Sequence, residues 1–205
     1  MWHSEVISPP AEATARALAS GSILTGFYLA GGTGLALQFG HRRSMDLDLF
    51  RADAFSEEAL VRQVRQAGEF TVVAMAPHTL HIVMGGVKVS FFAYEYPLLF
   101  PPGEFLGMPV ADPRDIACMK LSAVAGRGTK RDFVDLYEAS TRFGLPQLFT
   151  WFEQKYAGSR HNPVHLRKSL VYFEDAEKDP MPDMLTSLSW QQVKQYFSTE
   201  APGTL

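Results

Sequence analysis

"GGTGLALQFGHRRSMDLDLF", residues 31–50, is the stretch that decides how this chain is expected to fold. Two glycines open it, and two aspartates, Asp46 and Asp48, lie close to its end. Aspartate is disfavoured in β-strands, and two carboxylates on one strand face repel each other. An unfavourable pair of charges in otherwise apolar sequence indicates that a function, and not the fold alone, requires it.

The residues around the aspartates alternate between apolar and polar, which predicts a strand over residues 45–50. Side chains two apart on a strand point the same way, so Asp46 and Asp48 share one face while Leu47 and Leu49 point into the core. The two carboxylates then need a cation. A hard divalent ion such as Mg²⁺ (or Mn²⁺) suits them, because it binds carboxylate oxygens and completes its shell with water and phosphates. The alternative is a surface strand with two solvated aspartates.

The glycine turn supplies the other half of the predicted site. A short buried strand is expected before Gly31 and Gly32, and a helix over residues 33–39 after them, with Thr33 as its N-cap. The two glycines have no side chain to keep a phosphate away, and the helix N-terminus offers free N–H groups. Ser44 could bond a phosphate oxygen or cap the turn. A phosphate chain linked through a metal to two aspartates describes a site for a nucleoside triphosphate (NTP).

The remaining pattern changes from strands to helices along the chain, which is typical of an α/β or α+β fold. We expect a sheet core over residues 1–111 and a helical part over residues 112–205 that packs on it, completes the site and forms one compact unit with it. Further strands are predicted at 70–76, 79–85 and 87–96, loops at 100–110 and 174–183, and helices at 10–20, 56–68, 112–128, 130–141, 146–157, 163–173 and 189–197.

The amino-acid composition limits the classes of protein to which this chain can belong. The chain has 205 residues, of which 46% are hydrophobic and 20% charged, and this argues against disorder. The net charge of −3 excludes a uniformly basic surface, although residues 112–170 carry ten basic against six acidic side chains and favour an anionic ligand there. The single cysteine, Cys118, excludes an internal disulfide and fits the cytoplasm. The charge-free run 17–40 contains six glycines and several polar residues, so we interpret it as soluble core and expect no membrane association.

A second group of candidate residues lies on the helix that begins near residue 112. Lys120 and Arg127 are two helical turns apart on a stripe that also contains Ile116 and Val124. Burial of a lysine in such a stripe is costly unless it has a partner. The two cations could hold a triphosphate or stabilise the charge on a leaving pyrophosphate. The alternative is that Lys120 extends its amine to water and Arg127 only complements the helix C-terminus.

These motifs together resemble a known family. The glycines, thirteen residues from Thr33 to Met45, and then "DLD" resemble the signature of the polymerase-β-like nucleotidyltransferase superfamily. Together with "MKLSAVAGRGTKRDFVDLYEA", residues 119–139, the stretch is similar to the AbiEii/AbiGii abortive-infection nucleotidyltransferase toxins. The resemblance implies a mixed β-sheet flanked by helices, a helical C-terminal part, and Mg²⁺-dependent transfer of a nucleoside monophosphate from an NTP to an acceptor with release of pyrophosphate.

The resemblance also implies roles for single residues. The family has an acidic residue directly after a lysine or arginine, which here is Asp132 after Arg131, with Asp135 as the second choice. Asp132 could orient Lys120 or act as the base on the acceptor hydroxyl. Many superfamily members also place a third carboxylate on a later strand. By alternation Ser90 occupies that place in this chain, which puts a second metal and the activity itself in question.

The resemblance extends to partners. It implies an RNA acceptor such as a tRNA end, and an antitoxin protein from a bacterial toxin–antitoxin pair. Two alternatives stay open at this point. One is nucleotide transfer to a small hydroxyl compound such as an antibiotic, and the other is a catalytically inactive protein that binds nucleotides or a partner.

Overall fold

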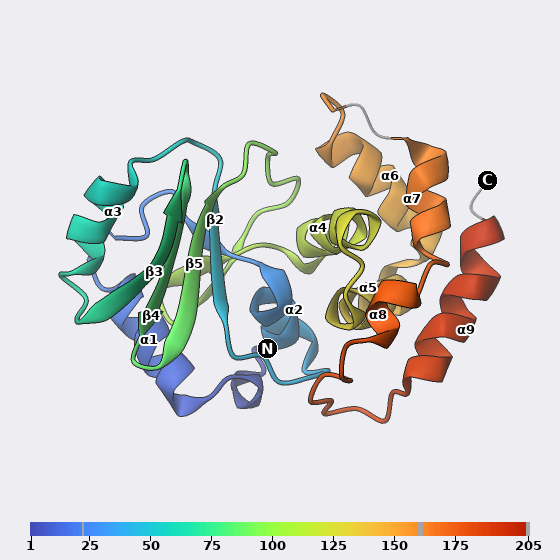
Figure 1. The fold of residues 1–205 in the computed structure, drawn as a ribbon, viewed down its shortest axis with the longest axis horizontal. Coiled ribbons are helices and arrows are strands. Elements are labelled where there is room, and N and C mark those ends of the chain that lie inside the picture. Colours follow the sequence, from blue (N-terminus) through green and yellow to red (C-terminus); the bar gives the residue numbers. More distant parts are fainter. Residues whose placement is uncertain (22, 160–161, 204–205) are drawn as a thin grey trace. The chain divides into compact units, whose positions relative to one another are not determined.

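The computed structural model describes residues 1–21, 23–159 and 162–203 of the chain. The described residues form two compact units, Met1–Asp112 and Pro113–Leu205. The first contains a seven-stranded sheet with helices and the second contains helices (Figure 1). Within these residues, no helix has the length and apolar character needed to cross a membrane. The expected α/β class, with strands first and helices after them, is confirmed.

The sheet has the order β3-β4-β5-β2-β1-β7-β6 and mixes strand directions. The central strand β2 runs antiparallel to β1 and parallel to β5. On the far side of β1, β7 pairs with it in parallel, and the β6–β7 hairpin forms one edge. The strands are β1 Tyr28–Leu29, β2 Leu47–Arg51, β3 Phe70–Ala76, β4 Thr79–Met84, β5 Val87–Ala93, β6 Gly103–Phe105 and β7 Met108–Val110.

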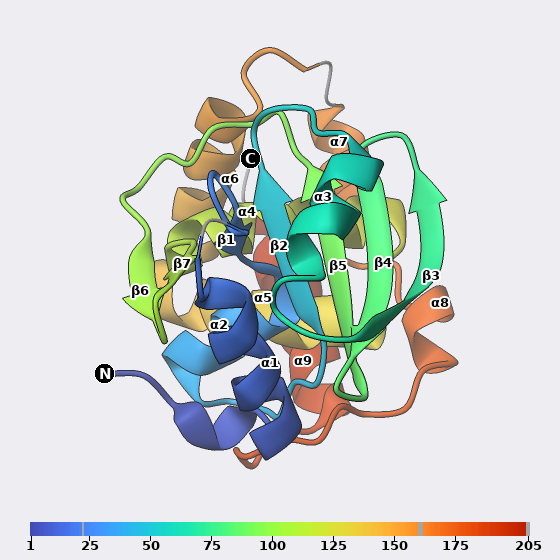
Figure 2. The ribbon, with the colours of Figure 1, turned by 90° about the vertical axis from the view of Figure 1, so that its left-hand side faces the viewer.

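Three α-helices accompany the sheet: α1 Pro9–Ala19, α2 Gly31–Phe39 and α3 Glu57–Val64. The hydroxyl of Ser56 accepts a hydrogen bond from the backbone N–H of Ala59 and caps α3, as its sequence predicts. Helices α1 and α3 lie on the same side of the sheet (Figure 2). Their apolar residues form one core with alternate residues of the strands, including Leu49, Leu80 and Phe91, each of them fully buried. The strand residues in between therefore belong to the opposite face of the sheet.

The second unit consists of six α-helices among its described residues. Thr129 caps α5 through its side chain, and Ser189 and Gln192 form a reciprocal capping box at the start of α9. Phe133 of α5 and Phe197 of α9 are fully buried against each other. The helices are α4 Pro113–Gly126, α5 Lys130–Phe143, α6 Leu145–Lys155, α7 Pro163–Ser169, α8 Glu174–Glu177 and α9 Trp190–Glu200.

Two segments differ from the expected loops. Residues 100–110 contain the β6–β7 hairpin, in which Phe105 pairs with Met108 across a two-residue turn. Both turn residues, Leu106 and Gly107, have positive φ, as such tight hairpins require. Strands of three residues are too short to show a readable alternation. The second segment contains the single-turn helix α8, which is likewise below the length at which periodicity can be recognised.

The interior of the second unit contains the single cysteine. Cys118 of α4 is fully buried, and burial raises the pKa of its thiol to about 12. The thiolate is the reactive form of cysteine. We therefore expect iodoacetamide to alkylate native protein at a rate set by unfolding, and to modify Cys118 at once in urea. Mass spectrometry of quenched samples measures the adduct.

A matched control places a thiol at an exposed site of the same unit. Ser187 is exposed, so Ser187→Cys should gain one rapidly formed adduct while Cys118 remains protected. Rapid modification of Cys118 in protein with a native circular dichroism spectrum would contradict the buried position.

Candidate functional site

The first candidate site is built where α2 begins beside β2. Helix α2 starts at Gly31, with Ala30 as its N-cap, so the expectation that Thr33 caps it is wrong. The backbone N–H of Ala30 donates to the carbonyl oxygen of Asp48 at 3.0 Å, which joins the helix start to the strand. Both glycines therefore lie in the first turn of the helix, where backbone N–H groups have no partner within the helix.

A steric constraint explains why residue 31 is a glycine. Its φ is +62°, and a Cβ at this position would lie 2.7 Å from Oδ2 of Asp48. A real Cβ does not approach an oxygen so closely, and an L-residue rarely adopts this φ. The carboxylate of Asp48 thus lies directly against the helix start, and only glycine leaves it room.

Thr33 and Ser44 hold the loop before β2. The Thr33 hydroxyl donates to the carbonyl of Asp46, and its Oγ1 lies 2.7 Å from Oγ of Ser44. A hydroxyl has one proton, so Ser44 donates to Thr33 in this arrangement. Thr33 and Ser44 are 2% and 9% exposed. Their shared role is structural in this geometry, because they fix the backbone that presents Asp46.

The two aspartates are half-buried and follow the expected alternation. Leu47 and Leu49 of β2 are buried in the core, and Asp48 between them belongs to the opposite face. Asp46 is the residue directly before the strand. Gly40 ends α2 in the left-handed conformation, as predicted, and begins the connection to these residues.

The donor set fits a divalent ion that also binds a ligand. No three His, Cys, Asp or Glu side chains of the described residues gather into a complete metal site. Two half-buried carboxylates beside a helix start provide oxygen ligands only. Mg²⁺ is typically held by one or two carboxylates together with water and substrate phosphates, so these residues match its preferences.

The strand next to β2 places Ser90 beside Asp48. The parallel pair β2–β5 matches Asp48 with Ser90, so Ser90 lies on the same sheet face as Asp48, as alternation predicts, and the register places the two side by side. The antiparallel pair β4–β5 then matches Ser90 with His81, whose Nδ1 lies 3.0 Å from the Ser90 Oγ. A carboxylate, a hydroxyl and an imidazole thus form one row across three adjacent strands.

The second candidate group lies within the helical unit around Asp132. Lys120 Nζ contacts Oδ1 of Asp132 at 2.9 Å and Oδ2 of Asp135 at 2.7 Å. Arg127 donates to both oxygens of Asp132, from Nε at 2.7 Å and from Nη2 at 3.0 Å. The hydroxyl of Thr129 adds a third donor at 2.7 Å. The expected proximity of Lys120 to Asp132 is therefore present in this unit, so Lys120 does not simply reach for solvent, and Arg127 contacts the same carboxylate.

The surroundings of Asp132 keep it ionised. Burial by itself would raise the pKa of Asp132, but the charge of Lys120 and the bonds from Arg127 and Thr129 outweigh it and lower that pKa. A carboxylate so strongly held is a weak proton acceptor. Of the two roles predicted for Asp132, the lowered pKa favours orientation of cations, here Lys120 and Arg127, over the role of base. Arg127 itself is 68% exposed, so its guanidinium can hold Asp132 and remain accessible to a ligand.

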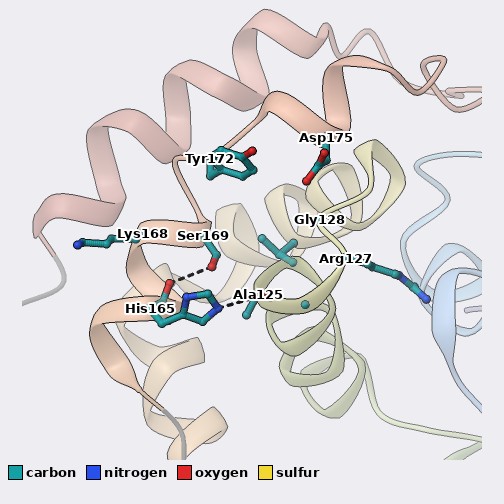
Figure 3. Close-up of a pocket in the computed structure, with 10 residues that line it drawn as sticks. Ala125, Arg127, Gly128, His165, Lys168, Ser169, Tyr172 and Asp175 are labelled. Atoms are coloured by element: carbon teal, nitrogen blue, oxygen red, sulfur yellow. Dashed lines mark hydrogen bonds between the residues drawn. The ribbon is translucent and has the colours of Figure 1, made fainter.

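A cavity of about 340 Å³ lies near the end of α4, between it and α7 and α8. Figure 3 shows that Arg127, although it lines this cavity, directs its side chain away from His165 and Lys168. His165 is held by the carbonyl of Ala125 at 3.1 Å from its Nε2. The guanidinium that contacts Asp132 therefore points away from the part of the cavity that His165 and Lys168 line.

One feature of the helical unit and one of the sheet were not predicted. Lys155 of α6 and Asp115 of α4 form an ion pair of 2.7 Å with both side chains fully buried. The apolar run around Lys155 was a signal, since a lysine there needs a partner, but its partner lies 40 residues away. His81 was not predicted as a site residue either, because only the strand register brings it beside Ser90.

The geometry predicts that Gly31→Ala displaces Asp48 and destabilises the first unit. An alanine at positive φ costs about 1–2 kcal/mol even without overlap, and the contact with Asp48 adds to this. Urea unfolding measures the loss. Gly126→Ala is the matched control, because a Cβ there meets no described heavy atom within 4 Å and its φ is not left-handed. Equal stability of the two variants would contradict the close approach.

The ion pairs of Asp132 predict a pH-dependent stability. The folded-state pKa is lowered, so ionised Asp132 stabilises the fold above the unfolded pKa of about 3.9, and this contribution is lost as the pH falls below it. Wild type should therefore unfold at higher urea than Asp132→Asn at neutral pH, and the difference should shrink between about pH 5 and 3. Asp53→Asn, at a side chain 88% exposed, is the control and should show little difference at any pH. A wild-type advantage that is the same at all pH values would contradict the assignment.

Comparison with known proteins shows the family. The family model described as nucleotidyl transferase AbiEii toxin, type IV toxin–antitoxin system, matches residues 16–97 and 85–203. The uncharacterized protein aq_aa25 of Aquifex aeolicus is 38% identical over 181 residues, which cover 85% of this chain and 86% of that protein.

Two solved structures share the fold. MenT4, a nucleotidyltransferase toxin from Mycobacterium tuberculosis, superposes with a TM-score of 0.57 and 18% identity over 96% of this chain and 85% of its own. JHP933 from Helicobacter pylori gives a TM-score of 0.57 and 17% identity over 95% and 88% of the two chains. The resemblance that the sequence indicated is confirmed, and this chain belongs to the AbiEii nucleotidyl transferase toxin family.

Proposed function

We propose that this chain transfers a nucleoside monophosphate from an NTP to an acceptor hydroxyl in a reaction that requires Mg²⁺ (or Mn²⁺). Asp46 and Asp48 would hold the ion, and Gly31, Gly32 and the start of α2 would receive the phosphate chain. The observation that carries the proposal is the approach of the Asp48 carboxylate to Gly31, where a Cβ would lie 2.7 Å from Oδ2. Phosphate at the helix start and a metal on that carboxylate would then be immediate neighbours.

The basic cluster of the second unit completes the proposal. Lys120 and Arg127 would neutralise charge on the triphosphate and on the departing pyrophosphate, and Asp132 would keep both cations oriented. The support is that Asp132 already binds both, while Arg127 remains 68% exposed. Ser44 and Thr33 would contribute indirectly, because they fix the backbone at Asp46.

The chemistry needs little covalent participation by the protein. The acceptor oxygen forms a bond to the α-phosphorus, the bond from that phosphorus to the bridging oxygen breaks, pyrophosphate leaves, and the acceptor proton passes to a base. When bound, the divalent ion supplies charge neutralisation at the phosphates. The chain supplies orientation: backbone N–H groups at α2 position the phosphates, and cations hold the leaving group.

The acceptor and the biological setting belong to the same proposal. Family membership supports an RNA acceptor such as a tRNA end, and an antitoxin protein as a partner in a bacterial toxin–antitoxin pair, with action in the cytoplasm. Transfer to a small hydroxyl compound, or nucleotide binding without transfer, are the alternative outcomes that the experiment below separates.

The test is incubation of the protein with Mg²⁺, each labelled NTP and total bacterial RNA, or a panel of small hydroxyl compounds, while pyrophosphate is measured. Asp48→Asn keeps the shape of the side chain and removes its charge. It should lower turnover by more than about 100-fold, since even outer-shell changes at metal sites cost roughly 10–100-fold. Removal of the metal with EDTA should abolish turnover and added Mg²⁺ should restore it.

Controls separate the alternatives. Asp53→Asn, at an exposed carboxylate, should label as wild type does. Labelling of small hydroxyl compounds without labelling of RNA would show that the acceptor is a small compound. NTP binding without release of pyrophosphate would show that the protein binds nucleotides but does not transfer them. Equal turnover by wild type and Asp48→Asn would overturn the assignment of the aspartates.

A further inference from the structure

The proposed transfer needs a proton acceptor, and the held carboxylates are poorly suited to that task. The acceptor hydroxyl must lose its proton as its oxygen bonds to phosphorus. Asp46 and Asp48 are assigned to the metal, and Asp132 is engaged by Lys120, Arg127 and Thr129. A carboxylate that already accepts four hydrogen bonds has little capacity left for a further proton. The base should therefore be another group on the same sheet face as Asp48.

The sheet register identifies such a group. Asp48, Ser90 and His81 occupy matched positions on β2, β5 and β4, and their strand neighbours Leu49, Phe91 and Leu80 are in the core on the other face. All three side chains therefore share one face. Adjacent strands are about 4.8 Å apart, so the Cα atoms of His81 and Asp48 lie roughly 10 Å apart with Ser90 between them. A metal-bound phosphate and an acceptor hydroxyl fit into a span of that size.

The imidazole of His81 is fixed on one nitrogen and accessible on the other. Its Nδ1 lies 3.0 Å from the Ser90 Oγ, and the ring packs edge-on against Phe92 with the centroids 5.4 Å apart. Nε2 forms no hydrogen bond with any described residue, and it is not fully buried. If Nδ1–H donates to Ser90, Nε2 carries the lone pair and meets solvent. This is the tautomer a general base requires.

We propose that His81 is the general base of the proposed transfer and that Ser90 is its positioning residue. Nε2 of His81 takes the acceptor proton as the acceptor oxygen bonds to the α-phosphorus. The imidazole becomes an imidazolium, and the electrons of the breaking bond leave on pyrophosphate. Ser90 keeps Nδ1–H in place during this step and accepts its hydrogen bond. The inference rests on the proposed function, because it assigns a residue to the same reaction.

The charged groups that face His81 come from its neighbouring strands. On β5, Lys88 is two residues from Ser90 and exposed, and on β2 the nearest is Asp48. On the other side, β3 contributes none, because residues 70–76 contain no titratable side chain. Lys88 and Asp48 are thus the charged side chains of β5 and β2 that share the sheet face of His81.

The experiment compares wild type with His81→Gln, His81→Ala and Ser90→Ala in two assays. One measures turnover with saturating NTP and Mg²⁺, and the other measures binding of a fluorescent NTP with Mg²⁺ at equilibrium. Loss of a general base lowers turnover by about 10²–10⁴-fold, and nucleotide affinity should stay unchanged. Added imidazole should restore part of the turnover of His81→Ala, which no purely structural role would produce. Ser90→Ala should lose less turnover than His81→Gln.

His78→Asn is the matched control, because this histidine lies in the turn before β4, where its ring is held by the Phe55 carbonyl. It should keep wild-type turnover. Unchanged turnover in His81→Gln, or loss of nucleotide binding together with turnover, would overturn the role of His81 while leaving the proposed function intact. Absence of turnover by wild type with every NTP and acceptor would overturn the proposed function and the role of His81 with it.

Discussion

The first unit depends on one steric constraint, the absence of a side chain at Gly31. Because no Cβ lies there, the carboxylate of Asp48 can rest against the first turn of α2, and the N–H of Ala30 can reach the carbonyl of the same residue. We propose phosphate binding for this helix start and metal binding for this carboxylate, two roles that separate elements of a protein can serve. Here the chain returns through Gly40 and the Thr33–Ser44 contact so that both occupy one place. Under the proposed function, a divalent ion would offset the repulsion between the neighbouring aspartates.

The helical unit follows a different rule, that buried charges come in matched groups. Lys120 is enclosed by Asp132 and Asp135, and Lys155 by Asp115. Loss of one partner of a buried pair typically costs about 3–5 kcal/mol, because the other charge is left without compensation. These pairs join α4 to α5 and to α6, so the same contacts that present Arg127 also fix how the helices pack. Orientation of the cations and stability of the unit are therefore difficult to separate by mutation of Lys120 alone.

Short sequence patterns predicted those features of the fold that depend on residues close together in the chain. Strand β2, the cap at Ser56 and the stop at Gly40 could be predicted because each depends on a few adjacent residues. Thr33 was assigned the wrong role, since a cap is chosen by where the helix starts, and here tertiary contact with Asp48 starts it two residues earlier. The pairing of Lys155 with Asp115 and the row from Asp48 to His81 could not be predicted, because they depend on elements about 40 residues apart. Alternation correctly placed Ser90 on the face of the aspartates, but only the register put it beside Asp48.

The order of the strands has a consequence for synthesis of the chain. β2 is held between β1 and β5, and β1 in turn pairs with β7, so that Leu29 lies opposite Val110. A nascent chain that has just emerged beyond Asp48 contains both aspartates and both glycines but has no sheet in which to hold them. Such long-range pairings form late, since the intervening segment must first be made and closed into a loop. The ribosome must therefore translate past Val110 before this member of a toxin family can assemble its sheet, and translation itself sets the earliest moment at which the site exists.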